Sequence, residues 1–127
     1  EPGYERKRIE QFLIESLVLV PAGARLITAA DPGVGEVLQH SQELADQGLR
    51  NQVPQTRLMV SLAREMGAVG VSSFGAGWGG SVYALVPADD AQDFASQWLQ
   101  AYRDREQEAE LSSTIVTRPG TGACRVF

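Results

Sequence analysis

The chain has 127 residues, of which 43% are hydrophobic and 21% are charged, a composition typical of one globular domain. Its formal net charge of −5 and its scattered basic residues argue against a nucleic-acid or anionic-membrane partner, because such binding needs clustered Lys and Arg. The single cysteine, Cys124, excludes an intrachain disulfide and does not support a thiolate metal site. No apolar run approaches the roughly 20 residues of a membrane-spanning helix, so we expect a soluble protein, and the lone cysteine fits a reducing cytoplasm.

The first half of the chain is predicted to be helical. Apolar residues recur at spacings of three and four over residues 4–20, which is typical of an amphipathic helix. Pro21 is expected to interrupt it, since proline is not tolerated in a helix interior, and a short further helix should follow. Similar spacing, with proline at helix starts and glycine at helix ends, predicts helices near residues 34–48 and 54–67.

After residue 67 the pattern changes to short, β-rich segments. Residues 69–74 and 81–86 read as two strands of an antiparallel hairpin, and residues 91–102 as an amphipathic helix. Two further strands are expected at 113–117 and 123–127, on either side of a Pro-Gly-Thr-Gly turn. This order predicts an α+β fold, a two-layer sandwich with helices on one face of an antiparallel sheet.

The loop of the predicted hairpin is unusually rich in glycine. Gly75, Gly77, Gly79 and Gly80 fall within six positions, whereas an ordinary hairpin needs one or two glycines. Glycine permits positive φ and lets the backbone approach a ligand, so such a loop can wrap amide groups around an anion. A bulged turn without a ligand remains the alternative.

Three phosphate-binding motifs can be tested against this loop. The dinucleotide fingerprint G-x-G-x-x-G requires a helix directly after it, and here a strand follows. The protein-kinase version matches through Val82, but it requires a lysine on the next strand, and the only lysine of this chain is Lys7. A Walker A loop is excluded because no Gly-Lys-Ser or Gly-Lys-Thr occurs.

The stretch Phe-Gly-Ala-Gly-Trp-Gly-Gly-Ser at residues 74–81, with the strand Val-Tyr-Ala-Leu-Val after it, resembles the third conserved motif of the GHMP small-molecule kinases. Trp78 stands where that family usually has phenylalanine. Weaker resemblances cover His40 to Leu44, Val53-Pro54 and residues 119–126. The galactokinase branch of the family is the most similar, and the resemblance extends over most of the chain.

The resemblance implies a C-terminal domain with a ferredoxin-like fold, in an enzyme that transfers a phosphoryl group from ATP, with Mg²⁺, to a sugar hydroxyl. In such kinases the ATP-phosphate loop and the catalytic aspartate belong to an N-terminal domain, which would be the partner of this one. Neither is found here, so no catalytic base or metal ligand is assigned. The expected nucleotide- and substrate-binding residues are Gly75, Ala76, Gly77, Trp78, Gly79, Gly80 and Ser81.

Other polar candidates have simpler explanations. His40 lacks a second metal ligand four residues away, so a packing or surface role is expected for it and not a metal-binding one. Asp89-Asp90 fits helix capping better than acid–base catalysis. Asn51-Gln52 either faces the cleft or satisfies turn backbone. Trp78 either packs under the loop or contacts a ligand.

Two functions are compatible with these features. The first is the C-terminal part of an ATP-dependent sugar kinase, and because the chain begins Glu-Pro-Gly without an initiator methionine, it is expected to be a piece of a longer protein. The second is a stand-alone, non-catalytic binding or regulatory module derived from such a kinase. Under either, we expect the isolated 127 residues to lack kinase activity and to bind no cofactor.

Overall fold

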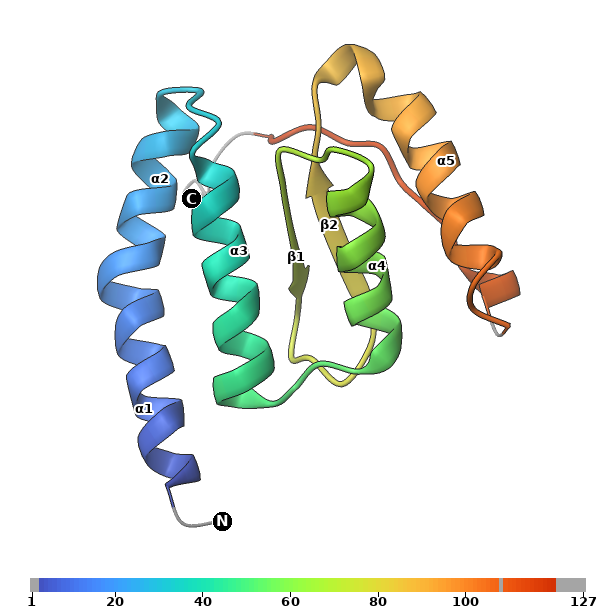
Figure 1. Ribbon diagram of the computed structural model, residues 1–127. Helices are drawn as coiled ribbons and strands as arrows, with labels where there is room; N and C mark the ends of the chain where they lie inside the picture. Colours follow the sequence, from blue (N-terminus) through green and yellow to red (C-terminus); the bar gives the residue numbers. More distant parts are fainter. Residues whose placement is uncertain (1–2, 108, 121–127) are drawn as a thin grey trace, which may run out of the picture.

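The computed structural model describes residues 3–107 and 109–120, and Figure 1 shows how their elements are arranged. Helices flank one antiparallel hairpin, so the predicted α+β class is confirmed. In chain order the elements are α1 (Tyr4–Ile14), η1 (Glu15–Leu19), α2 (Val20–Thr28), α3 (Val34–Leu44), η2 (Ala45–Leu49), α4 (Pro54–Glu65), β1 (Gly70–Phe74), β2 (Ser81–Leu85), η3 (Ala88–Asp90), α5 (Ala91–Arg103) and η4 (Ala109–Leu111).

The predicted hairpin is confirmed: β1 pairs antiparallel with β2, and Phe74 is opposite Ser81 at the loop end. α4 lies across one face of this hairpin and α5 lies beside α4 (Figure 1). Apolar side chains fill the space between these elements, as the alternating pattern of the strands and the helical spacing require. The residues of this core are Val60, Ala63 and Val71, with Ala68, Val82, Ala84, Phe94 and Trp98 packed against them.

α3 lies along the outer edge of β1 and approaches it unusually closely. A Cβ built on Gly35 would stand 1.9 Å from the carbonyl oxygen of Val69, and one built on Gly70 would stand 3.2 Å from the Cα of Gly35. The absence of side chains at both glycines is therefore what allows the contact. In this way α3 covers an edge that would otherwise present unpaired backbone groups.

The prediction that Pro21 interrupts the first helix is wrong. α1, η1 and α2 follow one another as one helix of 25 residues, Tyr4–Thr28. η1 is a π-helical segment that ends at Leu19, two residues before Pro21, and Pro21 itself lies in the first turn of α2. The wider π turn accommodates a residue that lacks an amide donor and whose ring crowds the preceding turn.

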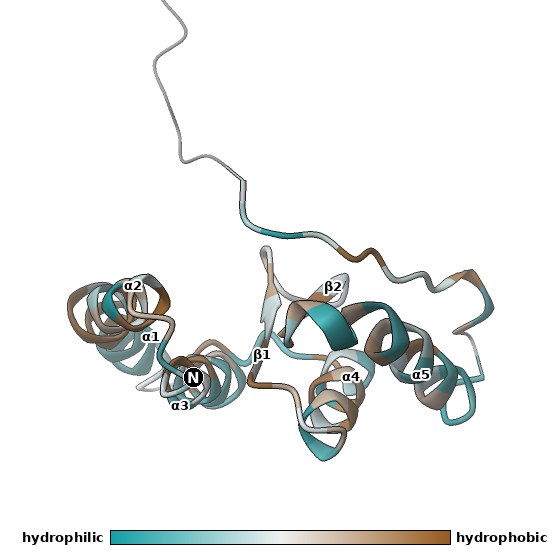
Figure 2. Cartoon of the chain, turned by 90° about the horizontal axis from the view of Figure 1, so that it is seen from above, coloured by the Kyte–Doolittle hydropathy of each residue, from teal (hydrophilic) through white to brown (hydrophobic). Residues whose placement is uncertain are grey.

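This long helix packs on α3 and leaves much of its apolar surface exposed. Exposed large apolar side chains along it are Ile9, Phe12, Leu13, Leu17, Val18, Val20 and Ile27. Figure 2 shows that the helix lies on the side of α3 away from the hairpin. By length and composition alone it could cross a membrane, contrary to the expectation from the sequence, but soluble proteins also contain helices that meet these criteria.

The strand predicted at residues 113–117 is not formed. This segment has no regular secondary structure, and Arg103 tethers its beginning by donating to the carbonyl oxygens of Glu110 and Ser112. β-rich composition makes a strand only where a partner edge is hydrogen-bonded to it. Here a groove separates the segment from β2. The strand predicted at 123–127 lies outside the described residues.

Candidate functional site

The loop between β1 and β2 has the irregular backbone that its glycines predict. Five of the six residues from 75 to 80 have positive φ: Gly75 (90°), Gly77 (85°), Trp78 (64°), Gly79 (114°) and Gly80 (95°). An L-residue with a side chain is disfavoured in this region by about 1–2 kcal/mol, so glycine is the residue that fits at most of these positions. Trp78 adopts the left-handed conformation despite its side chain.

Asn51, in the loop between η2 and α4, braces the glycine loop from one side. The Trp78 amide donates to the Asn51 carbonyl oxygen at 2.6 Å, and Asn51 Nδ2 donates to the Ala76 carbonyl oxygen at 3.3 Å. A Cβ on Gly77 would stand 2.5 Å from the Asn51 side chain. Asn51 therefore satisfies backbone groups, as one of the two interpretations of Asn51-Gln52 held, but the groups belong to the glycine loop.

The remaining loop amides differ from that of Trp78 in their hydrogen bonding. Among the described residues, the hydrogen bonds outside regular elements include no acceptor for the amides of Gly75, Ala76, Gly77, Gly79 or Gly80. Gly75, Ala76, Gly80 and Ser81 are exposed. The loop from 74 to 81 carries no ionisable side chain, so what it offers chemically is a set of neutral backbone donors with one hydroxyl.

A groove of about 890 Å³ runs along the outer side of β2, and the second half of the loop forms one end of it. The indole of Trp78 stands at this end and is 71% exposed, so the interpretation that it packs under the loop is wrong. Residues from three other segments complete the lining: Phe94, Trp98 and Tyr102 from α5, Val53 and Thr56 at the start of α4, and the segment Ser112–Thr117. An accessible aromatic ring therefore adjoins the free amides.

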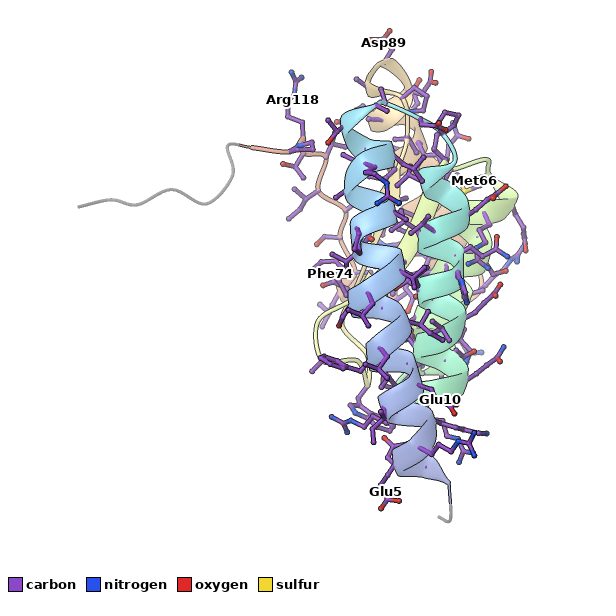
Figure 3. All side chains as sticks on the ribbon, turned by 90° about the vertical axis from the view of Figure 1, so that its left-hand side faces the viewer. Glu5, Glu10, Met66, Phe74, Asp89 and Arg118 are labelled. Atoms are coloured by element: carbon purple, nitrogen blue, oxygen red, sulfur yellow. The ribbon has the colours of Figure 1, made fainter. Side chains whose placement is uncertain are left out.

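An aromatic pair lies directly below the loop. Phe74, labelled in Figure 3, is the last residue of β1, and its ring centroid is 5.9 Å from that of Tyr83. Burial raises the pKa of the Tyr83 phenol above its ordinary value, and the negative charge of Glu15 raises it further. The phenol is therefore neutral near pH 7 and adds no charge to the loop.

Two other sequence candidates lie away from the loop. His40 is exposed on α3, and the described residues contain no group of three or more His, Cys, Asp or Glu able to hold a metal ion. Asp89 and Asp90 are exposed before α5; Asp90 occupies the N-cap position, but its side chain makes no capping hydrogen bond. The side-chain capping predicted for this pair is therefore not seen.

Sequence reasoning missed Gln42, and it considered Gln52 only as facing the cleft or satisfying turn backbone, whereas both side chains are buried behind the loop. Gln42 is 5% exposed and Gln52 is 6% exposed, and Ser72 and Ser73 of β1 hydrogen-bond to Gln42. The available signal was the position of Gln42, four residues after Leu38 on the apolar side of α3. A polar residue at such a position requires a buried partner.

Comparison with known proteins gives a consistent result. Galactokinase of Mycobacterium tuberculosis strains H37Ra and H37Rv is 28% identical over 121 residues, which are 95% of this chain and 33% of the relative. Galactokinase of Mycobacterium bovis BCG Pasteur is 28% identical over 120 residues, 94% of this chain and 33% of the relative. The chain thus spans about a third of the length of these curated relatives. The family model of the GHMP kinase C-terminal domain matches residues 31–104, which include α3, the hairpin with its glycine loop, and α5, and the chain belongs to this family.

Proposed function

We propose that this chain is the C-terminal domain of an ATP-dependent sugar kinase of galactokinase type. The observation that carries the proposal is an exposed, uncharged glycine loop, five of whose residues have positive φ, at the centre of the region that matches the GHMP kinase family. In the full-length protein this loop lines the phosphate and sugar cleft. The residues that form its wall are Gly75, Ala76, Gly77, Trp78, Gly79, Gly80 and Ser81.

The chemistry of the loop suits this role. Phosphoryl transfer requires mainly positioning and stabilisation of charge on the phosphoryl oxygens. Backbone amides at Gly79 and Gly80 can donate to such oxygens without adding a cation, and the exposed Ser81 hydroxyl can add a further donor. The loop contains no acid or base, so its contribution is to hold the phosphate and to exclude water.

The rest of the active site lies outside this chain in our proposal. An N-terminal GHMP kinase domain, in the same or a separate chain, supplies the ATP-phosphate loop and the catalytic aspartate. ATP and Mg²⁺ are the cofactors of the complete enzyme, a hexose or related sugar is the substrate, and the compartment is the cytoplasm. Because the described part of the chain brings no three metal-ligating side chains together, no Mg²⁺ ligand is assigned to it.

A non-catalytic binding or regulatory module is the alternative. The exposed apolar side chains of the Tyr4–Thr28 helix favour it, because surfaces of this kind mark contacts with other proteins. The two functions differ in one measurable property, since only a kinase couples the glycine loop to the turnover of ATP with a sugar.

The test is sugar phosphorylation by the full-length protein that contains this chain. Gly80→Ala places a methyl group at φ +95° with no atom within 4 Å, and Gly67→Ala does the same at φ +87°, at the end of α4. The two variants therefore carry similar backbone strain, but only Gly80 belongs to the loop. We expect Gly80→Ala to lower kcat/KM for ATP and galactose about tenfold or more, and Gly67→Ala to leave it within about twofold.

Two results would contradict the proposal. If both variants lose activity equally, the loop has no special part in the reaction. If the unaltered full-length protein phosphorylates none of a panel of hexoses and pentoses, the alternative function is favoured.

A further inference from the structure

Three carboxamide side chains connect the loop end of β1 to the glycine loop. Gln42 Nε2 donates to Gln52 Oε1 at 3.0 Å, and Gln52 Nε2 donates to Asn51 Oδ1 at 2.9 Å. Asn51 Nδ2 then donates to the carbonyl oxygen of Ala76 in the loop at 3.3 Å. We call these three side chains the amide relay. Each member donates to the next, so every bond runs in the same direction toward the loop.

The relay is anchored at its other end in β1. Gln42 Oε1 accepts from the Ser73 amide at 2.8 Å and from the Ser73 hydroxyl at 2.9 Å, and the Ser72 hydroxyl also donates to it at 3.2 Å. Ser73 is the residue before the last residue of β1, and Ala76 is the second residue of the loop. The relay thus links Ser73 to Ala76, which are only three residues apart, through side chains that come from α3 and from the 50–53 loop.

Burying the polar side chains of the relay carries a free-energy cost. Burying a carboxamide is unfavourable unless its donors and acceptors are paired. Apolar residues could fill the space behind β1 without this requirement. Here Gln42 and Gln52 are almost fully buried, and no buried side-chain nitrogen or oxygen among the described residues lacks a partner. Fully satisfied networks of this kind fix one geometry of the groups they bind.

We propose that Gln42 and Gln52 are positioning residues for phosphoryl transfer, acting through Asn51 on the glycine loop. This inference rests on the proposed kinase function. The Asn51 backbone and side chain hold the peptide groups of Ala76 and Trp78, and the relay fixes Asn51. A loop with this much positive φ has few contacts of its own, so its amides keep one orientation toward the phosphate only while Asn51 is held.

The test compares substitutions at two buried residues in the full-length protein, one inside the relay and one outside it. Gln52→Met keeps the size of the side chain but removes both relay bonds. Val60→Ala is the control for lost stability: Val60 is 4% exposed and packs with Ala63 and Val71, and it belongs neither to the relay nor to the lining of the groove. Both variants should lose stability, and only Gln52→Met should disturb the loop.

The first readout is kinetic. We expect Gln52→Met to lower kcat about 10- to 100-fold with a smaller change in KM for ATP, because a misplaced loop loses interactions made in the transition state. Val60→Ala should stay within about threefold of the unaltered protein when both are assayed well below their Tm. Equal kinetic losses in the two variants would mean that the relay acts through stability alone.

The second readout reports on the loop without any turnover. In protein labelled with ¹⁵N-glycine, the amide resonances of Gly75, Gly77, Gly79 and Gly80 should shift in Gln52→Met and remain in place in Val60→Ala. If the unaltered protein proves inactive while these shifts occur, the proposed function fails but the relay still positions the loop. If the protein is active and the loop resonances do not move, the relay inference is overturned.

A conservative variant provides a rescue. In Gln52→Glu the ionised carboxylate can accept from Gln42 but cannot donate to Asn51, whereas the protonated carboxyl can do both. Burial favours the protonated form. The ratio of kcat in Gln52→Glu to kcat in the unaltered protein should therefore rise by about fivefold or more as the pH falls. A pH-independent ratio would contradict the directional relay.

Discussion

The two flanks of the β hairpin are built on different principles. Toward α4 and α5 the contact is apolar, with Val60, Ala63 and Val71 buried together. Toward α3 the contact is a close approach of two glycines, and next to it lies the amide relay. The apolar flank tolerates small adjustments of its side chains, whereas the α3 flank specifies distances and directions. We infer that the first holds the hairpin in the fold and the second holds the glycine loop in shape.

The largest effect is expected from removing atoms in the second apolar cluster, where α4 packs on α5 behind the apolar flank. Leu62 of α4 is 2% exposed and packs with Tyr102 of α5 and with Ala109. Leu62→Ala leaves a cavity and should lower the free energy of unfolding by about 3 kcal/mol. Leu17→Ala, on the exposed side of the long helix at 70% exposure, should change it by less than about 0.5 kcal/mol. Urea unfolding followed by circular dichroism measures both, and a similar loss in the two variants would show that Leu62 is not a core residue.

A smaller loss should follow from adding one methyl group on the α3 flank. Gly35→Ala places a Cβ 1.9 Å from the carbonyl oxygen of Val69, so α3 must move away from β1, at a cost of about 2 kcal/mol. In Gly23→Ala the new Cβ would stand 3.6 Å from Val37, an ordinary contact, and helix propensity should stabilise α2 by about 0.5–1 kcal/mol. Tm shifts of opposite sign are therefore predicted. A rise in Tm for both would mean that α3 does not pack on β1 at this distance.

The smallest effect concerns Tyr83 on β2, the strand beside the groove. Its pKa is raised above 10.0 by burial and by Glu15, so the folded state binds the phenolic proton more tightly than the unfolded state does. The resulting stabilisation is complete below about pH 10 and is lost as the pH rises through the folded-state pKa. Tyr83→Phe should therefore show a shallower fall in Tm between about pH 9.5 and 11. Parallel curves for the two proteins would contradict the assigned pKa direction.

The sequence pattern was sufficient to predict those helices and strands whose apolar spacing and boundary residues both indicate the same element. α4 begins at Pro54 and ends at Glu65, two residues before Gly67, and the strands on either side of the glycine loop are short and β-rich. Pro21 shows the limit of this reasoning, because a π turn can absorb a proline that a regular helix cannot. The segment 113–117 shows another, since a strand depends on a partner edge that composition does not reveal.

The candidate site was predictable only in part. The glycines identify a loop with positive φ by themselves, because few other residues adopt that conformation. The relay could not be predicted, since Gln42 and Gln52 are ten residues apart and Gln42 meets Ser73 thirty-one residues later. Polar residues form such a network only when the fold brings their partners together, and the spacing of these residues in the sequence does not indicate which partners will meet.

The two tryptophans of the chain occupy contrasting surroundings. Trp98 is partly buried and its indole donates to the Met59 carbonyl oxygen at 3.0 Å, whereas the Trp78 indole is largely in solvent at the loop. Their fluorescence should therefore differ in wavelength and in accessibility to quenchers such as iodide. Phosphate-bearing compounds that approach the loop should alter only the red-shifted component, while unfolding of the core alters the other. The protein thus carries two intrinsic optical probes that report on these separate events without any added label.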